Sequence, residues 1–275
     1  MKRKIKIKLN LLPYVLWMTL FVLVPLMLII AFAFTTPEGT FTFNNIIYAT
    51  KYSAVFGRSI VFGAIATLIC FIIGYPMAYF ISKTKIKYQS IFIMLLMIPM
   101  WTSFLLRTYA WMTILEYNGL LNKVISFFGF EKINMINTPG AIILGMIYNF
   151  LPYMILPIYT ALSKMDKRVI EAAQDLGANK LKIFKKIIFP LSLSGVISGV
   201  TMVFVPSVST FVISKMLGGG SILVIGDLIE MQFLGNSYNP YLGSAISLIL
   251  MIIILICMGI MNQLEDNSGG RKATK

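Results

Sequence analysis

The stretch Ser163–Pro190, SKMDKRVIEAAQDLGANKLKIFKKIIFP, is a charged segment between two long apolar runs. Its pattern predicts two short helices joined at a glycine. Ser163 and Asp166 are residue types that favour a helix start. Gly177 can adopt the left-handed conformation that ends a helix, and Asn179 can begin the next one.

Each of these two helices carries one apolar face. On the first helix the apolar positions follow the spacing i, i+3, i+4, i+7 and are Val169, Ala172, Ala173 and Leu176. On the second helix they are Ile183, Phe184, Ile187 and Ile188. The lysines lie mostly elsewhere around the second helix. A pair of helices with so little hydrophobic bulk of its own is typical of a docking element.

The rest of the chain predicts an all-α integral membrane protein. Of the 275 residues, 58% are apolar and 12% are charged. A helix needs about 20 apolar residues to cross a bilayer, and six runs reach that length: 13–34, 59–81, 91–115, 139–162, 191–213 and 243–262. The fifth run contains Pro206 and several Ser and Thr residues, so we expect it to be the least regular. The docking loop 163–190 lies between the fourth and fifth runs.

The basic residues predict the orientation of the chain. Eighteen of the 24 Lys and Arg residues fall in four segments that share one side of the membrane: 1–12, 82–90, 163–190 and 263–275. By the positive-inside rule this side is the cytoplasm. We therefore expect a multi-pass protein of the plasma membrane with both termini cytoplasmic. Anionic lipid headgroups account for the charge of +14, so no nucleic-acid partner is expected.

The first apolar run follows a basic start and resembles a secretory signal. Its apolar part is too long for the hydrophobic region of a signal peptide, and five further runs follow. We therefore interpret it as a retained first span, which places the N-terminus, this helix and an outer loop in residues 1–56.

Several kinds of chemistry are missing from the sequence. There is no His, no phosphate-binding P-loop motif and no Cys or His cluster with metal-ligand spacing. No Asp or Glu lies well inside a run, whereas a proton-coupled transporter needs a titratable group at membrane depth. We therefore expect a non-catalytic subunit without a metal, whose energy comes from another subunit.

Arg107 is the only charged residue within a run. Its placement near mid-membrane costs about 2.5–3.5 kcal/mol on insertion scales, so it needs compensation. One interpretation is structural: the guanidinium bonds carbonyls freed near Pro99, bonds a partner subunit or extends outward to the interface. The other places Arg107 in a translocation path or its gate. Aromatic residues that could line such a path are Trp101, Tyr109, Trp111, Tyr148 and Tyr153.

The docking loop resembles the EAA loop of ABC importer permeases of the binding-protein-dependent, MetI-like (type I) family. That pattern is Glu-Ala-Ala, three residues, Gly, nine residues, and Ile-x-Leu-Pro. The chain matches it with Phe189 in place of the Leu. The resemblance implies that the residues docking an ATPase subunit are Glu171, Ala172, Ala173, Asp175, Gly177, Ile187 and Pro190.

The resemblance also implies an assembly. Residues 57–262 would be the permease transmembrane domain and 263–275 a cytoplasmic tail. The chain would pair with a second, homologous permease subunit and with two cytoplasmic ATPase subunits. An extracytoplasmic binding protein would deliver the substrate. ATP and Mg would bind the ATPase subunits, and this chain would hold no cofactor.

Within the family the chain is most similar to spermidine/putrescine permease subunits. The similarity is best over residues 57–262, and three stretches carry it: Pro99–Tyr109, Leu151–Pro157 and Gly218–Leu234. It implies a polyamine substrate, for which the candidate cation contacts at the outer mouth are Glu116, Asp227 and Glu230. Asp227 stands where Asn is expected. Because Arg107 would repel a cation, a permease for another small solute such as an anion stays open. A stand-alone channel or secondary transporter is the alternative from a different class.

Overall fold

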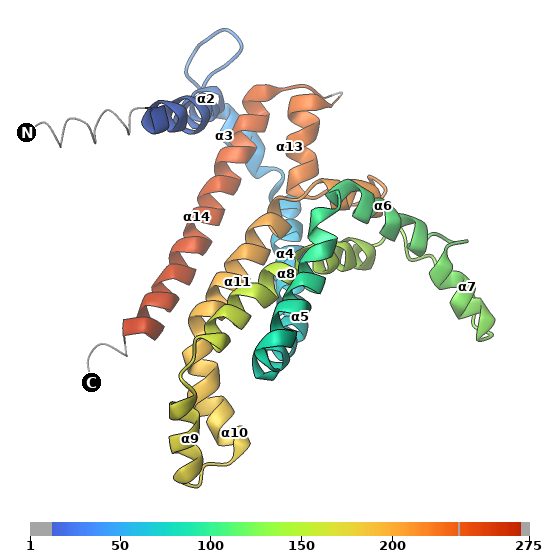
Figure 1. Ribbon diagram of the computed structural model, residues 1–275. Helices are drawn as coiled ribbons and strands as arrows, with labels where there is room; N and C mark the ends of the chain where they lie inside the picture. The colour runs from blue at the N-terminus through green and yellow to red at the C-terminus, as the bar shows by residue number, and fades with distance from the viewer. Residues whose placement is uncertain (1–12, 236, 271–275) are drawn as a thin grey trace, which may run out of the picture. The chain divides into compact units, whose positions relative to one another are not determined.

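The computed structural model describes residues 13–235 and 237–270. The basic start 1–12 and the last part of the predicted tail, 271–275, lie outside this description. Within the described residues the regular elements are helices, and Thr35 pairs with Phe41 in an isolated β-bridge. Figure 1 follows the helices along the chain. The all-α membrane fold predicted from the sequence is confirmed.

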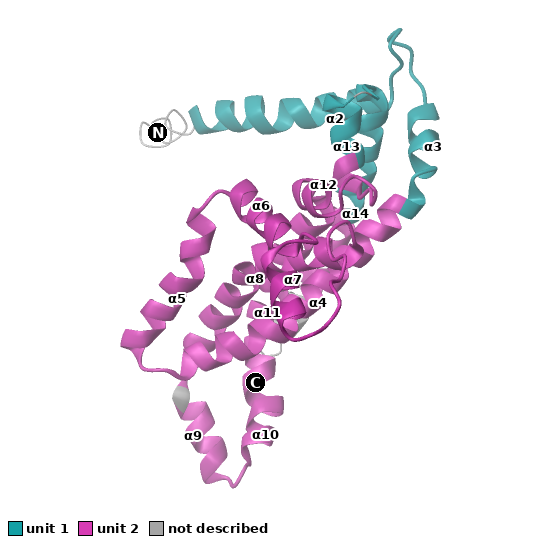
Figure 2. Ribbon diagram, turned by 90° about the vertical axis from the view of Figure 1, so that its right-hand side faces the viewer, with its two compact units in different colours: residues 1–54, 228–253 teal, residues 55–227, 254–275 magenta. Residues whose placement is uncertain are grey.

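The chain divides into two compact units (Figure 2). The first comprises Met1–Ala54 and Leu228–Ile253. The second comprises Val55–Asp227 and Ile254–Lys275 and contains the docking loop. Its helices are α4 (Ser53–Lys83, from Val55 onward), α5 (Ile86–Trp101), α6 (Phe104–Leu115), α7 (Leu120–Phe127), α8 (Pro139–Ser163), α9 (Lys167–Asp175), α10 (Lys180–Ile183), η2 (Phe184–Ile188), α11 (Phe189–Ser209) and α12 (Val212–Leu217).

In the first unit, the helix Pro13–Ala33 includes the π-helical turn η1 (Thr19–Leu23) and α2 (Val24–Ala33). The short helix α3 (Asn44–Thr50) follows. Besides the start of α4, two described helices are shared between the units: α13 (Ile225–Leu234) and α14 (Pro240–Gly270).

Five described helices are long and apolar enough to cross a membrane, and a sixth span is counted if a bent pair is taken as one. That pair is Ile86–Trp101 with Phe104–Phe127, bent by 88°. The predicted span 91–115 therefore corresponds to two helices with a sharp bend between them, and not to one helix. Thr102 takes up an extended conformation, and its N–H and hydroxyl both donate to the Pro99 carbonyl, at 3.3 and 2.7 Å.

The helix of the fifth run also differs from its prediction. It is continuous from Lys180 to Ser209, so the second half of the docking loop continues into α11 and is not a separate short helix. The helix continues through Pro206 and stops where Thr210 becomes extended, so the predicted run 191–213 extends past the end of the helix. Contrary to expectation, the third span and not the fifth has the sharp break.

A wide helical turn explains how the fifth span passes Pro190. In the π-helical turn η2, the Phe189 N–H bonds the Phe184 carbonyl five residues back. Pro190 follows at once and has no N–H to donate, so a change in the hydrogen-bond register lets the helix continue. The first span repeats this arrangement, with η1 directly before Val24 and Pro25.

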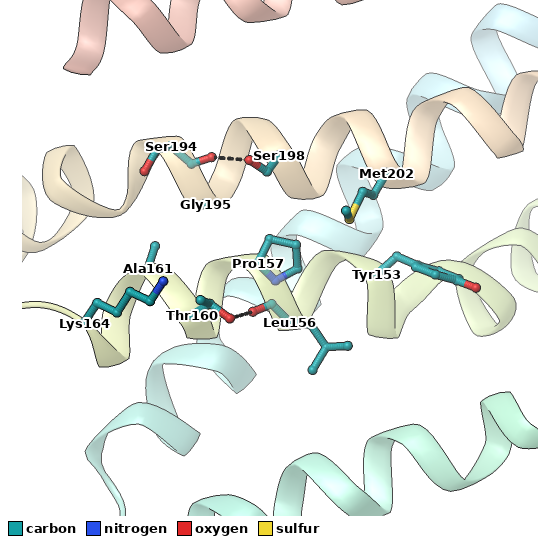
Figure 3. Close-up of a pocket in the computed structure, with 10 residues that line it drawn as sticks. All are labelled: Tyr153, Leu156, Pro157, Thr160, Ala161, Lys164, Ser194, Gly195, Ser198 and Met202. Atoms are coloured by element: carbon teal, nitrogen blue, oxygen red, sulfur yellow. Dashed lines mark hydrogen bonds between the residues drawn. The ribbon is translucent and has the colours of Figure 1, made fainter. Parts of the chain in front are cut away.

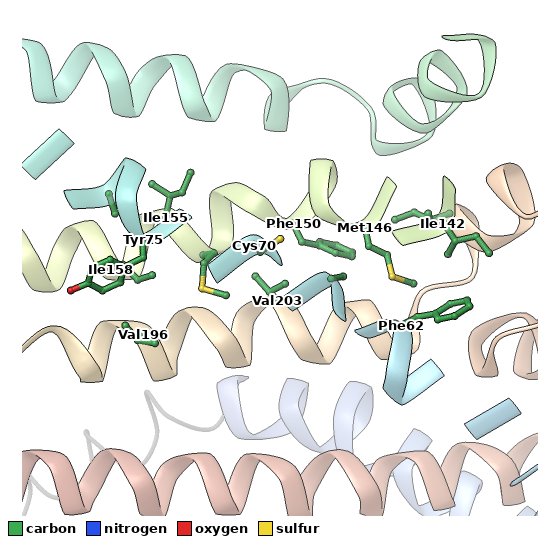
Figure 4. Close-up of a cluster of buried hydrophobic side chains, with 14 of the residues drawn as sticks. Phe62, Cys70, Tyr75, Ile142, Met146, Phe150, Ile155, Ile158, Val196 and Val203 are labelled. Atoms are coloured by element: carbon green, nitrogen blue, oxygen red, sulfur yellow. The ribbon is translucent and has the colours of Figure 1, made fainter. Parts of the chain in front are cut away.

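The core of the second unit lies between α4, α8 and α11 (Figure 4). Met154, Ile155 and Ile158 of α8 are fully buried in it, as is Val203 of α11. Two polar bonds add to this packing. The Tyr75 hydroxyl bonds the Ser192 hydroxyl at 2.8 Å, linking α4 to α11. The Tyr159 hydroxyl donates to Gln89 Oε1 at 2.9 Å, linking α8 to α5.

Candidate functional site

The docking loop forms a hairpin at one end of α8 and α11 (Figures 1 and 2). Asp166 caps α9, since its carboxylate accepts from the Arg168 N–H at 2.9 Å. Asn179 caps α10 in the same way, accepting from the Lys182 N–H at 2.8 Å. Both starts were predicted. Ser163 is instead the last residue of α8, and its hydroxyl donates to the Thr160 carbonyl at 3.1 Å.

Two hydrogen bonds close the turn between the helices. The Gly177 N–H donates to the Gln174 carbonyl at 2.8 Å, and the Ala178 N–H donates to the Ala173 carbonyl at 3.0 Å. This pair of bonds is the Schellman motif, which needs a left-handed residue after the helix. Gly177 provides it with φ of 74°. The predicted role of Gly177 in the bend is confirmed.

The helix α9 has two small apolar faces that point in different directions. Ile170 and Ala173 pack against the buried core of the unit. Val169, Ala172 and Leu176 are exposed, and the Leu176 side chain is 88% accessible. These three lie at i, i+3 and i+7, so they share one side of the helix. We call them the exposed apolar stripe.

Two of the acidic residues of the docking loop, Glu171 and Asp175, are exposed one turn apart on α9. Toward the span, Ile187 is half-buried and Pro190 is exposed. The loop therefore presents small, apolar and acidic side chains together on one short helix.

Aromatic packing ties the second half of the loop to α4. The ring of Phe184 lies edge-on to Tyr75 and Tyr79, with centroids 5.8 and 5.9 Å apart. Phe189 adds a contact to Tyr75 at 5.7 Å. Ile183 and Ile188 are buried and belong to the same core cluster as Tyr75. A displacement of the loop would consequently act on both α11 and α4.

A groove of about 590 Å³ lies between α8 and α11 (Figure 3). It extends along α8 from Tyr153 to Lys164, with hydroxyl groups from both helices on its walls: Thr160, Ser194 and Ser198. The hydroxyls of Thr160 and Ser198 donate to carbonyls of their own helices, at 2.8 and 2.9 Å. Each hydroxyl oxygen keeps lone pairs that can accept from a solute. The residues that line the groove include no carboxylate.

Sequence reasoning found Tyr153 but missed these hydroxyl residues. Ser194 and Ser198 are spaced i, i+4 in the apolar fifth run, so the sequence does place them on one side of a helix. The sequence does not show that this side of the helix faces the side of α8 that carries Thr160.

Arg107 lies half-buried on α6, with its guanidinium carbon 5.9 Å from the centroid of the Phe104 ring. Its Nε is buried and has no hydrogen-bond partner among the described residues. The carbonyl of Pro99, which the structural interpretation made a candidate partner, accepts instead from Thr102. A buried donor without a partner is uncommon and calls for an explanation.

The structure brings together two of the other candidate path residues. The rings of Trp111 and Tyr148 meet edge-on, with centroids 5.3 Å apart, where α6 contacts α8. Trp101 and Tyr109 are instead 74% and 55% exposed.

Of the three candidate cation contacts, Asp227 is buried and bonded. Its carboxylate accepts from the Ser214 hydroxyl at 2.8 Å and from the Val224 N–H at 3.0 Å, at the start of α13. Glu116 is exposed at the end of α6, and Glu230 is half-buried on α13. Their predicted role toward a cation stays a prediction.

Residues 70–267 match the family described as "Binding-protein-dependent transport system inner membrane component". The chain is 36% identical over 250 residues to the spermidine/putrescine transport system permease protein PotB of Haemophilus influenzae, covering 87% of each protein. It is 37% identical over 255 residues to PotB of Escherichia coli K12, covering 89% of this chain and 91% of that one.

The fold is also similar to a chain in the crystal structure of a bacterial ABC transporter that imports the acidic polysaccharide alginate. The TM-score is 0.82 at 17% identity, over 100% of this chain and 98% of the other. An identity this low supports the fold alone. The family match and the PotB similarity carry the assignment, and the chain belongs to the binding-protein-dependent transport system inner membrane components, the permease subunits of ABC importers.

Proposed function

We propose that this chain forms part of the path by which an ABC importer carries polyamines across the plasma membrane. The observation that carries the choice of cargo is the identity of 36–37% to permeases named for spermidine and putrescine, over nearly nine tenths of the chain. The chain itself is non-catalytic in this proposal, and ATP with Mg binds partner subunits.

The exposed apolar stripe of α9 is the proposed ATPase-docking surface. Small Ala172 lets a partner approach the helix backbone closely, and Leu176 supplies an apolar contact that is 88% exposed in this chain. Glu171 and Asp175 can bond polar groups at the rim of that contact. Closure of the ATPases on ATP would displace α9, and the Phe184 contacts would transmit the displacement to α4 and α11. Such switching requires contacts that differ between the two states.

The groove between α8 and α11 is the proposed path surface. Its hydroxyl oxygens can accept hydrogen bonds from ammonium groups, and the Tyr153 ring offers a face for a cation–π contact. Because its lining contains no carboxylate, the groove does not neutralise a polycation by itself. We therefore assign the neutralising carboxylates to a second, homologous permease subunit or to the extracytoplasmic binding protein.

The proposed orientation follows the charge distribution of the sequence. The docking loop faces the cytoplasm, where two ATPase subunits bind, and both termini lie on that side. The outer face then receives the binding protein.

An anion or another small solute is the second candidate cargo, and Arg107 is the observation that favours it. Its buried Nε has no partner among the described residues and could serve an anionic group. A cation near this side chain would need carboxylates from elsewhere.

The deciding experiment is uptake of radiolabelled spermidine by proteoliposomes that hold the chain with its partner permease, ATPase and binding protein. We expect uptake that requires ATP on the ATPase side, is competed by putrescine, and is lost when Glu171-Ala172-Ala173 is replaced. ATPase association without polyamine uptake would refute the cargo and leave the permease assignment intact.

A further inference from the structure

A second cavity, of about 470 Å³, lies where α4 and α8 end and the docking loop begins. The end of α4, the turn to α5 and the start of α5 form one wall. The end of α8 forms another, and Ile170 of α9 and Ile188 of η2 close the side toward the docking loop. The cavity is separate from the groove between α8 and α11, with which it shares no lining residue.

The charged residues that line this cavity are all basic. Lys83 and Lys85 line it, and its lining contains no Asp or Glu. The Lys83 ammonium lies 5.5 Å from the centroid of the Tyr79 ring, which keeps it at the cavity wall. Two acids directly follow lining residues in sequence, Asp166 and Glu171, and both are outside the lining. Asp166 caps α9 through the Arg168 N–H. An anionic group is therefore the complementary ligand.

Hydrogen bonds fix the turn that carries the two lysines. Gln89 Nε2 donates to the carbonyls of Ser82 and Thr84, at 3.2 and 2.9 Å. Gln89 Oε1 in turn accepts from the Tyr159 hydroxyl of α8. These bonds order the turn and tie it to α8.

The other half of the lining is apolar. It includes Ile86, Leu162, Ile170 and Ile188. Lys83 is the last residue of one candidate span, and Ser163 is the last residue of another. The cavity therefore lies where two candidate spans end, and in the proposed orientation this end is the cytoplasmic one. A ligand that fits this lining carries both an anionic group and an apolar part.

We propose that this cavity binds the phosphate headgroup of an anionic phospholipid, with Lys83 and Lys85 on the phosphate and the apolar wall against the start of the acyl chains. Basic pockets between spans on the cytoplasmic side bind such headgroups in other membrane proteins. The inference rests on the proposed orientation but not on the proposed cargo. Because Ile170 and Ile188 belong to the docking loop, a bound lipid would brace the loop against the α4–α5 turn.

The test measures lipid binding to the purified transporter in nanodiscs, without ATP or cargo, so its result is independent of the proposed transport function. The nanodiscs contain phosphatidylcholine with or without phosphatidylglycerol, and bound lipid is counted by native mass spectrometry. The variants are K83Q/K85Q, K85Q alone, and the matched control K87Q. Lys87 is exposed two residues after Lys85 and does not line the cavity.

We expect the wild-type protein and K87Q to retain phosphatidylglycerol preferentially. Each basic residue near an anionic lipid surface strengthens binding by about fivefold. We therefore expect lipid retention about fivefold weaker in K85Q and about thirtyfold weaker in the double variant. K83R/K85R should retain the lipid. Equal retention of the two lipids would overturn the proposal, as would the same loss in K87Q as in K85Q. Displacement by inorganic phosphate at equal concentration would identify a free anion, not a lipid, as the ligand and would also overturn it.

Discussion

The N–H of Ala178 donates to the carbonyl of Ala173 at 3.0 Å, which folds the chain back around Gly177. Leu176 lies inside this closed turn, yet its side chain is 88% exposed. The bond thus fixes an apolar side chain in solvent at the end of α9. An exposed Leu held by backbone hydrogen bonds is an ordered contact surface for a partner.

Replacing Gly177 should disrupt this surface. Its φ of 74° is in the left-handed region, where a β-branched residue is strongly disfavoured and Asn is tolerated. We expect G177V to reduce co-purification of the ATPase subunit and ATP-dependent uptake by about tenfold, with normal membrane insertion. G177N is the matched control and should stay within about twofold of wild type.

A Cβ on Gly177 meets nothing within 4 Å, so crowding does not complicate this comparison. Unchanged ATPase co-purification in G177V would contradict the proposed role of the turn. An equal loss in G177N would show that any side chain, whatever its backbone preference, blocks docking.

Close packing of α8 and α11 leads to a prediction about stability. A Cβ on Gly195 would lie 2.6 Å from both the Pro157 carbonyl oxygen and the Ala161 Cβ. Overpacking of this kind costs about 1–3 kcal/mol. We expect G195A to lower the apparent Tm in detergent by several degrees.

The control for this change is G259A, because a Cβ on Gly259 meets nothing within 4 Å. Ala is also the better helix former there, so its Tm should be equal to or slightly above that of wild type. Equal Tm values for G195A and G259A would mean that α8 and α11 separate easily enough to accept the methyl group.

The docking turn was predictable because its determinants are local. Asp166, Gly177 and Asn179 act through backbone groups within three residues of themselves, and a single sequence contains that information. The continuity of the second loop helix with the fifth span was not predictable. It depends on a π-helical turn before Pro190 and on Phe184 packing against Tyr75, more than one hundred residues away in the chain.

The candidate path residues show the same difference between local determinants, which a sequence contains, and tertiary contacts, which it does not. Sequence reasoning chose aromatic residues one at a time, and the structure pairs Trp111 with Tyr148 while leaving Trp101 exposed. Which side of α8 meets α11 is a tertiary property, and it is visible in the close approach of Gly195 and Gly199 of α11 to α8. The hydroxyl-lined groove could therefore not be derived from periodicity in one helix.

Arg107 should matter more for transport than for folding. A hydrogen bond to a charged group contributes about 1.5–3 kcal/mol to stability. The buried Nε of Arg107 has no hydrogen-bond partner among the described residues, so its removal breaks no such bond there. We expect R107A to reduce uptake by at least about tenfold while membrane expression stays within about twofold. L106A is the control, since Leu106 is 68% exposed beside it.

Comparison of uptake with expression separates the two interpretations of Arg107. A parallel fall in both quantities would favour the structural role. Improved polyamine uptake in R107A would show that the charge repels the cargo, and it would identify Arg107 as a barrier in the path.

Asp227 provides a last prediction, because its carboxylate has a visible structural role. It accepts from the Val224 N–H and the Ser214 hydroxyl, and a cap of this kind contributes about 0.5–2 kcal/mol. We expect D227A to lower the stability of the purified protein by about that amount. D227N should lower it less, since an amide oxygen can still accept one bond and the amide nitrogen can donate to Ser214.

Measuring thermal stability and spermidine uptake on the same D227N preparation decides between capping and cation binding. If Asp227 acts only as a cap, uptake follows the amount of folded protein in both variants. A D227N protein with wild-type stability and strongly reduced uptake would contradict that, because only the charge is removed. The negative charge of Asp227 would then act on the cation during transport, as the sequence suggested.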